Sequence, residues 1–91
     1  MDKSISSLIQ AILSLETAGE ARNFLTDLCT PQELEDLCVR WQIVTEIEKG
    51  LSYRAIHEKT DVSISTIGRI AKTMKYGSGG YSLIHQRLKK T

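Results

Sequence analysis

The chain has 91 residues, of which 41% are apolar and 25% are charged, and its formal net charge at pH 7 is +1. This composition is typical of one globular domain and excludes an intrinsically disordered chain. The sequence has no run of eighteen apolar residues, and no basic segment leads into an apolar core with a small-residue cleavage site. It therefore predicts neither a membrane span nor a secretion signal, and we expect a cytoplasmic protein.

Charge is distributed unevenly along the chain. Residues 1–51 hold four Lys/Arg and nine Asp/Glu, whereas residues 52–91 hold eight Lys/Arg and two Asp/Glu. Binding to a phosphate backbone requires positive charge gathered on one part of the surface, whereas solubility alone does not. The asymmetry therefore favours nucleic-acid binding by the second half of the chain.

Two helices are expected in the first 28 residues. Over residues 2–15, apolar side chains recur at helical spacing, which predicts a helix with a broad apolar face. Thr17 and Glu20 then match a capping box, in which each side chain satisfies a free backbone N–H at the start of a helix. The second helix places four apolar residues inward: Ala21, Phe24, Leu25 and Leu28.

A long third helix is predicted from Thr30 to about Lys49. Thr30 and Glu33 form another capping box, with Pro31 at the first helical position, and Gly50 supplies a left-handed residue to end the helix. Apolar residues lie along two sides, one with Leu34, Leu37, Cys38, Trp41, Val44 and Ile47 or Glu48, the other with Val39, Ile43 and Ile47. Such a helix suits the centre of a dimer core, and the alternative is the central helix of a monomeric bundle.

Residues 51–74 predict two short helices joined by a tight polar turn, which is a helix-turn-helix pattern. Ser52 can cap the first helix and Ser63 the second, and Thr60-Asp61 separates them. The second helix has an inward apolar stripe of Ile64, Ile67, Ile70 or Ala71, and Met74, and an outward face of Ser65, Thr66, Gly68, Arg69, Lys72 and Lys75. Such a helix can enter a major groove, and the alternative is an ordinary helical hairpin with a solvated face.

Two residues depart from the usual helix-turn-helix pattern. Asp61 stands where a glycine is common, and aspartate tolerates the left-handed conformation better than most residues. His57 stands where a small residue is common, so it requires either a looser helix crossing or a hydrogen bond. We therefore expect the turn to form despite both departures.

Glycine dominates residues 76–81, which we expect to be a hinge. No strand precedes them and no P-loop lysine follows them, so a nucleotide site is not expected. A short last helix is then patterned by Tyr81, Leu83 or Ile84, and Leu88. Its end carries a basic tail, which either contacts phosphate or stays solvated: Arg87, Lys89 and Lys90.

The cysteines and histidines do not indicate a metal site. Cys29 and Cys38 are isolated, with no CxxC motif, and we expect them to be reduced. His57 and His85 lack partners at ligand spacing. The sequence predicts no metal and no cofactor.

The ordered motifs resemble the Trp repressor family. They are the Leu28-Cys-Thr-Pro-x-Glu-Leu34 segment, Arg40 within the long helix, Gly50 at its end, and the Ser63-Ile-Ser-Thr-Ile-Gly-Arg69 segment. The similarity covers residues 25–76 and, more loosely, the whole chain. It looks closer to the Trp-repressor-like proteins of Gram-positive bacteria than to the tryptophan-sensing member.

The resemblance implies an all-α, six-helix fold and an intertwined homodimer. Residues 1–91 would be a single domain, with dimerisation helices in 1–50, a helix-turn-helix in 51–76, and a hinge and C-terminal helix in 77–91. Two-fold symmetry implies a roughly palindromic operator on double-stranded DNA, with half-sites about 34 Å apart.

The resemblance also implies a position for a small-molecule corepressor. In the family an indole ring lies between two arginines, which Arg40 and Arg69 match here, and Thr30, Thr66 and Thr73 match or adjoin other pocket positions. Guanidinium planes can stack on an aromatic ring. The residue after the second arginine is a glycine in the tryptophan-binding member and is Ile70 here, which disfavours tryptophan. Arg40 and Arg69 can instead form salt bridges, or Arg69 can contact DNA.

We therefore predict a sequence-specific DNA-binding transcriptional regulator, a repressor by its resemblance. Ser65, Gly68 and Arg54 are expected to contact base edges, and Lys72 and Lys75, with Ser52 or Ser63, to contact phosphate. The full predicted DNA face is Ser52, Tyr53, Arg54, Ser63, Ser65, Thr66, Gly68, Arg69, Lys72 and Lys75. A helical protein-interaction module without DNA readout is the alternative. An enzyme is not expected, because no catalytic set stands at a recognisable spacing.

Overall fold

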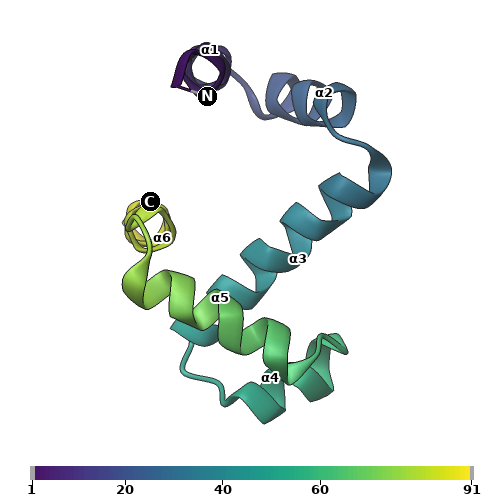
Figure 1. Cartoon of the computed structure of the whole chain (residues 1–91), viewed down its shortest axis with the longest axis vertical. Helices are drawn as coiled ribbons and strands as arrows, with labels where there is room; N and C mark the ends of the chain where they lie inside the picture. Colours follow the sequence, from purple (N-terminus) through teal and green to yellow (C-terminus); the bar gives the residue numbers. More distant parts are fainter. Residues whose placement is uncertain (1, 91) are drawn as a thin grey trace. The chain divides into compact units, whose positions relative to one another are not determined.

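The computed structural model describes residues 2–90, which form six helices and no strand (Figure 1). The helices are α1 (Asp2–Leu13), α2 (Ala18–Leu28), α3 (Pro31–Glu48), α4 (Tyr53–Thr60), α5 (Ile64–Tyr76) and α6 (Gly80–Lys89). Contacts divide the chain into two compact units, one up to Asp36 and one from Leu37 onward, so that α3 runs through both. The predicted all-α fold of six helices is confirmed.

The predicted capping boxes begin α2 and α3. At α3 the exchange is reciprocal, because the Glu33 N–H donates to Thr30 Oγ1 at 3.1 Å and the Thr30 N–H donates to Glu33 Oε1 at 2.8 Å. At α2 the Glu20 N–H donates to Thr17 Oγ1 at 3.1 Å, but Glu20 Oε1 accepts from the N–H of Glu16, one residue before the cap. Both start signals are therefore confirmed, with a shifted return bond at α2.

The helix ends agree less uniformly with the sequence. Gly50 has φ 88°, the left-handed conformation predicted for the end of α3. The first helix ends at Leu13 rather than at residue 15. Ser14 accounts for the earlier end, because its hydroxyl donates to the Ala11 carbonyl at 2.7 Å and competes with continued helix.

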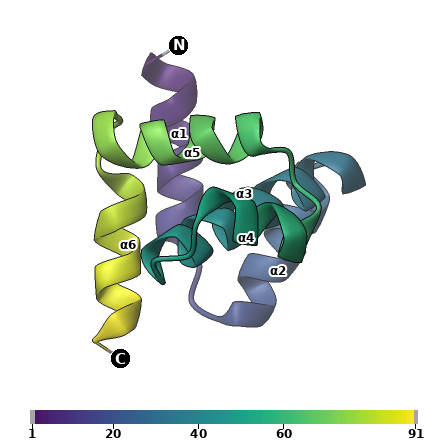
Figure 2. The same ribbon diagram turned by 90° about the horizontal axis from the view of Figure 1, so that it is seen from below.

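The second unit has a small apolar core built by α3, α4 and α5. Its buried members are Ile43 and Val44 of α3, Ile56 of α4, and Ile67 and Ile70 of α5. Partly buried side chains surround them: Val39, Trp41, Ile47, Leu51, Val62, Met74 and Tyr81. This core fixes the relative positions of α4 and α5, and Figure 2 shows α6 leaving the end of α5 at a steep angle.

Several residues predicted to face inward are exposed, among them Leu28 of α2, which is 52% exposed. Leu37 and Cys38 lie on α3 before the part of the helix that α4 and α5 cover, and Leu37 is 43% exposed. Ile64 is the first residue of α5 and is 49% exposed, because the core begins one turn later at Ile67. Among residues 2–90, no helix is both long enough and apolar enough to cross a membrane.

Candidate nucleic-acid interface

The helix-turn-helix begins where Ser52 caps α4. Ser52 Oγ accepts a hydrogen bond from the Ala55 N–H at 3.1 Å, as predicted. This cap places Tyr53 and Arg54 in the first turn of the helix, where both are exposed. Arg54 Nε lies 3.7 Å from Glu58 Oε1, and both side chains remain largely in solvent. Arg54 is therefore available to a partner at the start of α4.

The turn between α4 and α5 is held by side chains at every step. Asp61 adopts the left-handed conformation with φ 63°, as predicted. Thr60 Oγ1 donates to the Ile56 carbonyl at 2.7 Å and accepts from the Val62 N–H at 3.2 Å. His57 Nδ1 donates to the Val62 carbonyl at 2.7 Å, which is the hydrogen bond predicted as one way to accommodate this histidine. These hydrogen bonds connect the residues between α4 and α5 to the last turn of α4.

Hydroxyl groups satisfy the start of α5. Ser63 Oγ accepts from the Thr66 N–H at 3.2 Å, which confirms the predicted cap. The same oxygen donates to Thr66 Oγ1 at 2.9 Å and lies 3.3 Å from Ser65 Oγ. Thr66 is half-buried, whereas Ser65 is exposed. Ser65 is therefore an exposed hydroxyl residue in the first turn of α5.

The outward side of α5 is cationic. Arg69, Lys72 and Lys75 are exposed, α5 contains no acidic residue, and none of the three forms an ion pair within residues 2–90. Lys75 Nζ lies 5.5 Å from the centre of the Tyr76 ring, a weak cation–π contact. A Cβ added at Gly68 would meet no atom within 4 Å, so a partner can approach the backbone there.

Four of the five residues predicted for a corepressor lie together in the second unit. Arg40, Thr66, Arg69 and Thr73 line a cleft of about 380 Å³, which Ile70 and Tyr81 complete. The fifth, Thr30, belongs to the other unit, where its hydroxyl caps α3. The participation of Tyr81 was not predicted, because it depends on how the glycine-rich link returns the chain toward α3 and α5.

Residues 3–89 match the family model described as Trp repressor protein. The chain belongs to the Trp repressor family. It is 33% identical over 89 residues to the uncharacterized protein YerC of Bacillus subtilis strain 168, covering 98% of this chain and 86% of YerC. The crystal structure of a TrpR-like protein from Eubacterium eligens ATCC 27750 is 36% identical, with a TM-score of 0.89 over 96% of this chain and 90% of that one. A Staphylococcus aureus structure described as a candidate Trp repressor is 32% identical, with a TM-score of 0.88 over 96% and 87% of the two chains.

An apolar cavity adjoins the cleft in this Trp repressor family member. It has a volume of about 490 Å³ and shares Thr73 and Tyr81 with the cleft. Its remaining lining comes from Trp41, Met74, Ser78, Gly79, Gly80 and Ile84. The link that closes one side is tightly packed, since a Cβ on Gly77 would lie 2.5 Å from the Thr73 carbonyl oxygen. Gly77 therefore allows the close approach that ends α5.

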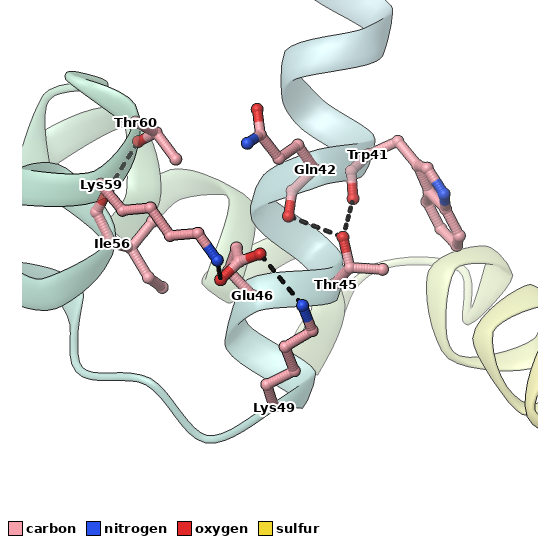
Figure 3. Close-up of polar contacts among 8 residues, drawn as sticks. All are labelled: Trp41, Gln42, Thr45, Glu46, Lys49, Ile56, Lys59 and Thr60. Atoms are coloured by element: carbon pink, nitrogen blue, oxygen red, sulfur yellow. Dashed lines mark hydrogen bonds and ion pairs between the residues drawn. The ribbon is translucent and has the colours of Figure 1, made fainter.

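Three side-chain contacts at the end of α3 were not predicted from the sequence. Glu46 is buried, and its carboxylate lies between Lys59 Nζ at 2.9 Å and Lys49 Nζ at 3.4 Å (Figure 3). The hydrogen bond from Lys59 lowers the pKa of Glu46, although burial acts in the opposite direction, and Lys49 lowers it further. Glu48 Oε2 lies 3.7 Å from His85 Nε2 of α6. Glu46 and Lys49 are three residues apart, a spacing that is visible in the sequence. A charged residue inside a helical pattern gives no signal of burial, however, so only the tertiary structure shows the contacts with Lys59 and His85.

Proposed function

We propose that this Trp repressor family protein is a sequence-specific DNA-binding transcriptional regulator. The observation that carries the proposal is the outward side of α5, where Ser65, Arg69 and Lys72 are exposed and the cations lack acidic partners within residues 2–90. Cations without internal partners are available to phosphates, and small polar groups at the start of a helix can reach base edges in the major groove.

The ten residues of the DNA face divide by role. Ser65, Gly68 and Arg54 contact base edges, whereas Lys72 and Lys75, with one of the capping serines, Ser52 or Ser63, contact phosphate. Tyr53, Thr66 and Arg69 complete the surface. In support, all except Thr66 and Gly68 are exposed, and those two are half-buried. In this proposal, the protein binds its operator through this face and acts as a repressor.

The proposed regulator acts as a homodimer on a roughly palindromic operator. Only five apolar residues are buried in the described chain, and α1 and α2 contain no buried residue. Large apolar side chains of α1 are instead exposed, among them Ile5 at 53% and Ile9 at 46%. A second copy would cover this apolar surface, and it would place two α5 helices on successive major grooves.

Titration of mixed-sequence duplex at low salt tests DNA binding directly. We expect micromolar binding that weakens steeply as salt rises, because phosphate contacts release counterions. Selection from a random duplex pool then gives the operator, which should be palindromic. Absence of duplex binding at low salt contradicts the proposal and favours the protein-interaction module.

A second proposal concerns the cleft beside α5. Arg40 and Arg69 line it and form no ion pair within residues 2–90, so the cleft favours an effector with a negatively charged group. The branched side chain of Ile70 also lines it and is 7% exposed, which argues against tryptophan as the effector. Repeating the duplex selection with tryptophan, and then with small carboxylates and phosphate esters, tests this. Binding that responds to tryptophan alone contradicts it.

A further inference from the structure

Glu46 connects the long helix to the helix-turn-helix. It lies in the last turns of α3, is 4% exposed, and is the buried charged residue of the described chain. Lys59, which it binds at 2.9 Å, is the penultimate residue of α4 (Figure 3). Lys49, the first residue after the end of α3, binds the other carboxylate oxygen. The carboxylate is therefore bound on one side by the turn that follows α3 and on the other by α4.

A series of hydrogen bonds connects the end of α4, where Lys59 lies, to the start of α5. Thr60 and His57 hold the turn residue Val62, each through a hydrogen bond to its backbone, and Ser63 caps α5 directly after it. A displacement of the end of α4 is therefore passed to the first turn of α5. The Glu46–Lys59 pair stands at the beginning of this series of contacts.

The free energy of the Glu46 ion pair indicates that it fixes the relative orientation of α3 and α4 more than it adds stability. Removing a carboxylate from water costs free energy, which the two lysines offset only when the groups are correctly placed, and an apolar residue can often fill such a position at no loss of stability. An ion pair between a buried carboxylate and a half-exposed lysine instead stabilises one relative orientation of the two helices. The Glu46 carboxylate also binds the ammonium groups of Lys49 and Lys59, which would otherwise be free to bind any phosphate.

We propose that Glu46, acting through Lys59, is a positioning residue that sets the orientation in which α5 meets DNA. The inference depends on the proposed function, because it concerns discrimination between DNA sequences. Glu46 touches no DNA in this scheme. Its effect is on the ratio of affinities for the selected operator and for mixed-sequence duplex.

The first test is Glu46→Gln, with both affinities measured by fluorescence anisotropy. We expect the ratio to fall about tenfold, comparable to the loss of one base-pair contact. Affinity for mixed-sequence duplex should not fall, because the change removes one negative charge and releases two lysines. Glu35→Gln is the matched control, since Glu35 is on the same helix, is exposed and has no ion pair within residues 2–90.

Variants of Lys59 provide a second test, which remains valid if Glu46→Gln does not fold. Lys59→Met should lower the ratio, whereas Lys59→Arg should restore most of it, because a guanidinium can still bind the carboxylate. The double variant Glu46→Gln/Lys59→Met should lose no more discrimination than the more affected single variant, since both remove one interaction.

An unchanged ratio in a folded Glu46→Gln or Lys59→Met protein, with folding checked by circular dichroism, overturns the inference. This includes a loss of affinity for both duplexes in equal proportion, which a purely structural role would produce. A wild-type protein that binds neither duplex overturns the proposed function instead, and that result is obtained before any variant is measured.

Discussion

Lys72 is one of the proposed phosphate contacts, and its substitution tests phosphate binding separately from base readout. It is exposed on the outward side of α5, without an ion pair in the described chain. We predict that Lys72→Ala weakens binding to all duplexes alike and reduces the slope of log affinity against log salt by about one, the value of one phosphate contact. Anisotropy titrations over a salt series measure both quantities. Lys3→Ala, a lysine of the acidic half, is the control, and an unchanged slope for Lys72→Ala removes this residue from the DNA face.

Arg54 is expected to behave differently. Its contact with Glu58 is exposed at 3.7 Å, and such a pair contributes less than about 1 kcal/mol to stability. We predict that Arg54→Ala leaves the fold intact, weakens operator binding by about 1–3 kcal/mol and relaxes base preference at the position it reads. Selection of bound duplexes with the variant measures the preference.

Glu58→Gln is the matched control for Arg54. It removes the same ion pair and keeps the guanidinium, so base preference should persist. If Glu58→Gln relaxes the preference as much as Arg54→Ala does, the effect comes from the start of α4 as a whole and Arg54 does not read a base.

At this scale, residues with local partners were predictable and those with distant partners were not. Ser52, Ser63 and Thr30 bond to N–H groups three residues away, and that spacing is visible in the sequence. Glu46 binds a lysine thirteen residues away, and Tyr81 reaches a cleft built largely by α5. No periodic pattern encodes either arrangement.

Among the elements, α3 and α4 are joined by an interaction that depends on pH. The pKa of Glu46 is lowered below its ordinary value of 4.5 chiefly by the hydrogen bond from Lys59. A carboxylate whose pKa is lowered in the folded state contributes its full stability above the ordinary value and loses it as the pH falls through the lowered value. The link between the two helices is thus complete at neutral pH.

Urea unfolding of the wild type and of Glu46→Gln tests this dependence. The difference in unfolding free energy should be constant from about pH 7 to about pH 5.5 and should shrink below about pH 4.5. Other carboxylates titrate in both proteins and cancel in the difference. A difference that stays constant into the acid range would show that the glutamate charge does not stabilise the fold.

Element boundaries followed the same division between local and distant causes. The starts of α2 to α5 have capping residues and were predicted closely, as was the end of α3 at Gly50. The inward faces were predicted less well, because Leu37 and Ile64 fit the apolar period yet lie beyond the part of each helix that the small core covers. Periodicity gives the face of a helix but not how far along it the neighbours extend.

At the scale of the whole molecule, the exposed apolar face of α1 indicates a surface that a second copy of the chain would bury. Burying an isoleucine side chain stabilises by about 1.5–3 kcal/mol, and α1 exposes several large apolar side chains in one chain. We predict that Ile9→Asp weakens dimerisation by more than about tenfold, because it removes that burial and places a charge against an apolar surface. Sedimentation equilibrium over a range of protein concentrations measures the change.

The neighbouring residue offers a control for this prediction. Gln10→Asp introduces the same charge at an exposed polar position of α1, so it should leave the dimer nearly unchanged.

Loss of the dimer should also reduce operator binding to that of one half-site. It should remove the dependence of thermal stability on protein concentration, since only an associating protein shows such a dependence. A wild-type protein that sediments as a monomer at tens of micromolar contradicts the dimer, and a palindromic operator would then have no structural origin in this chain.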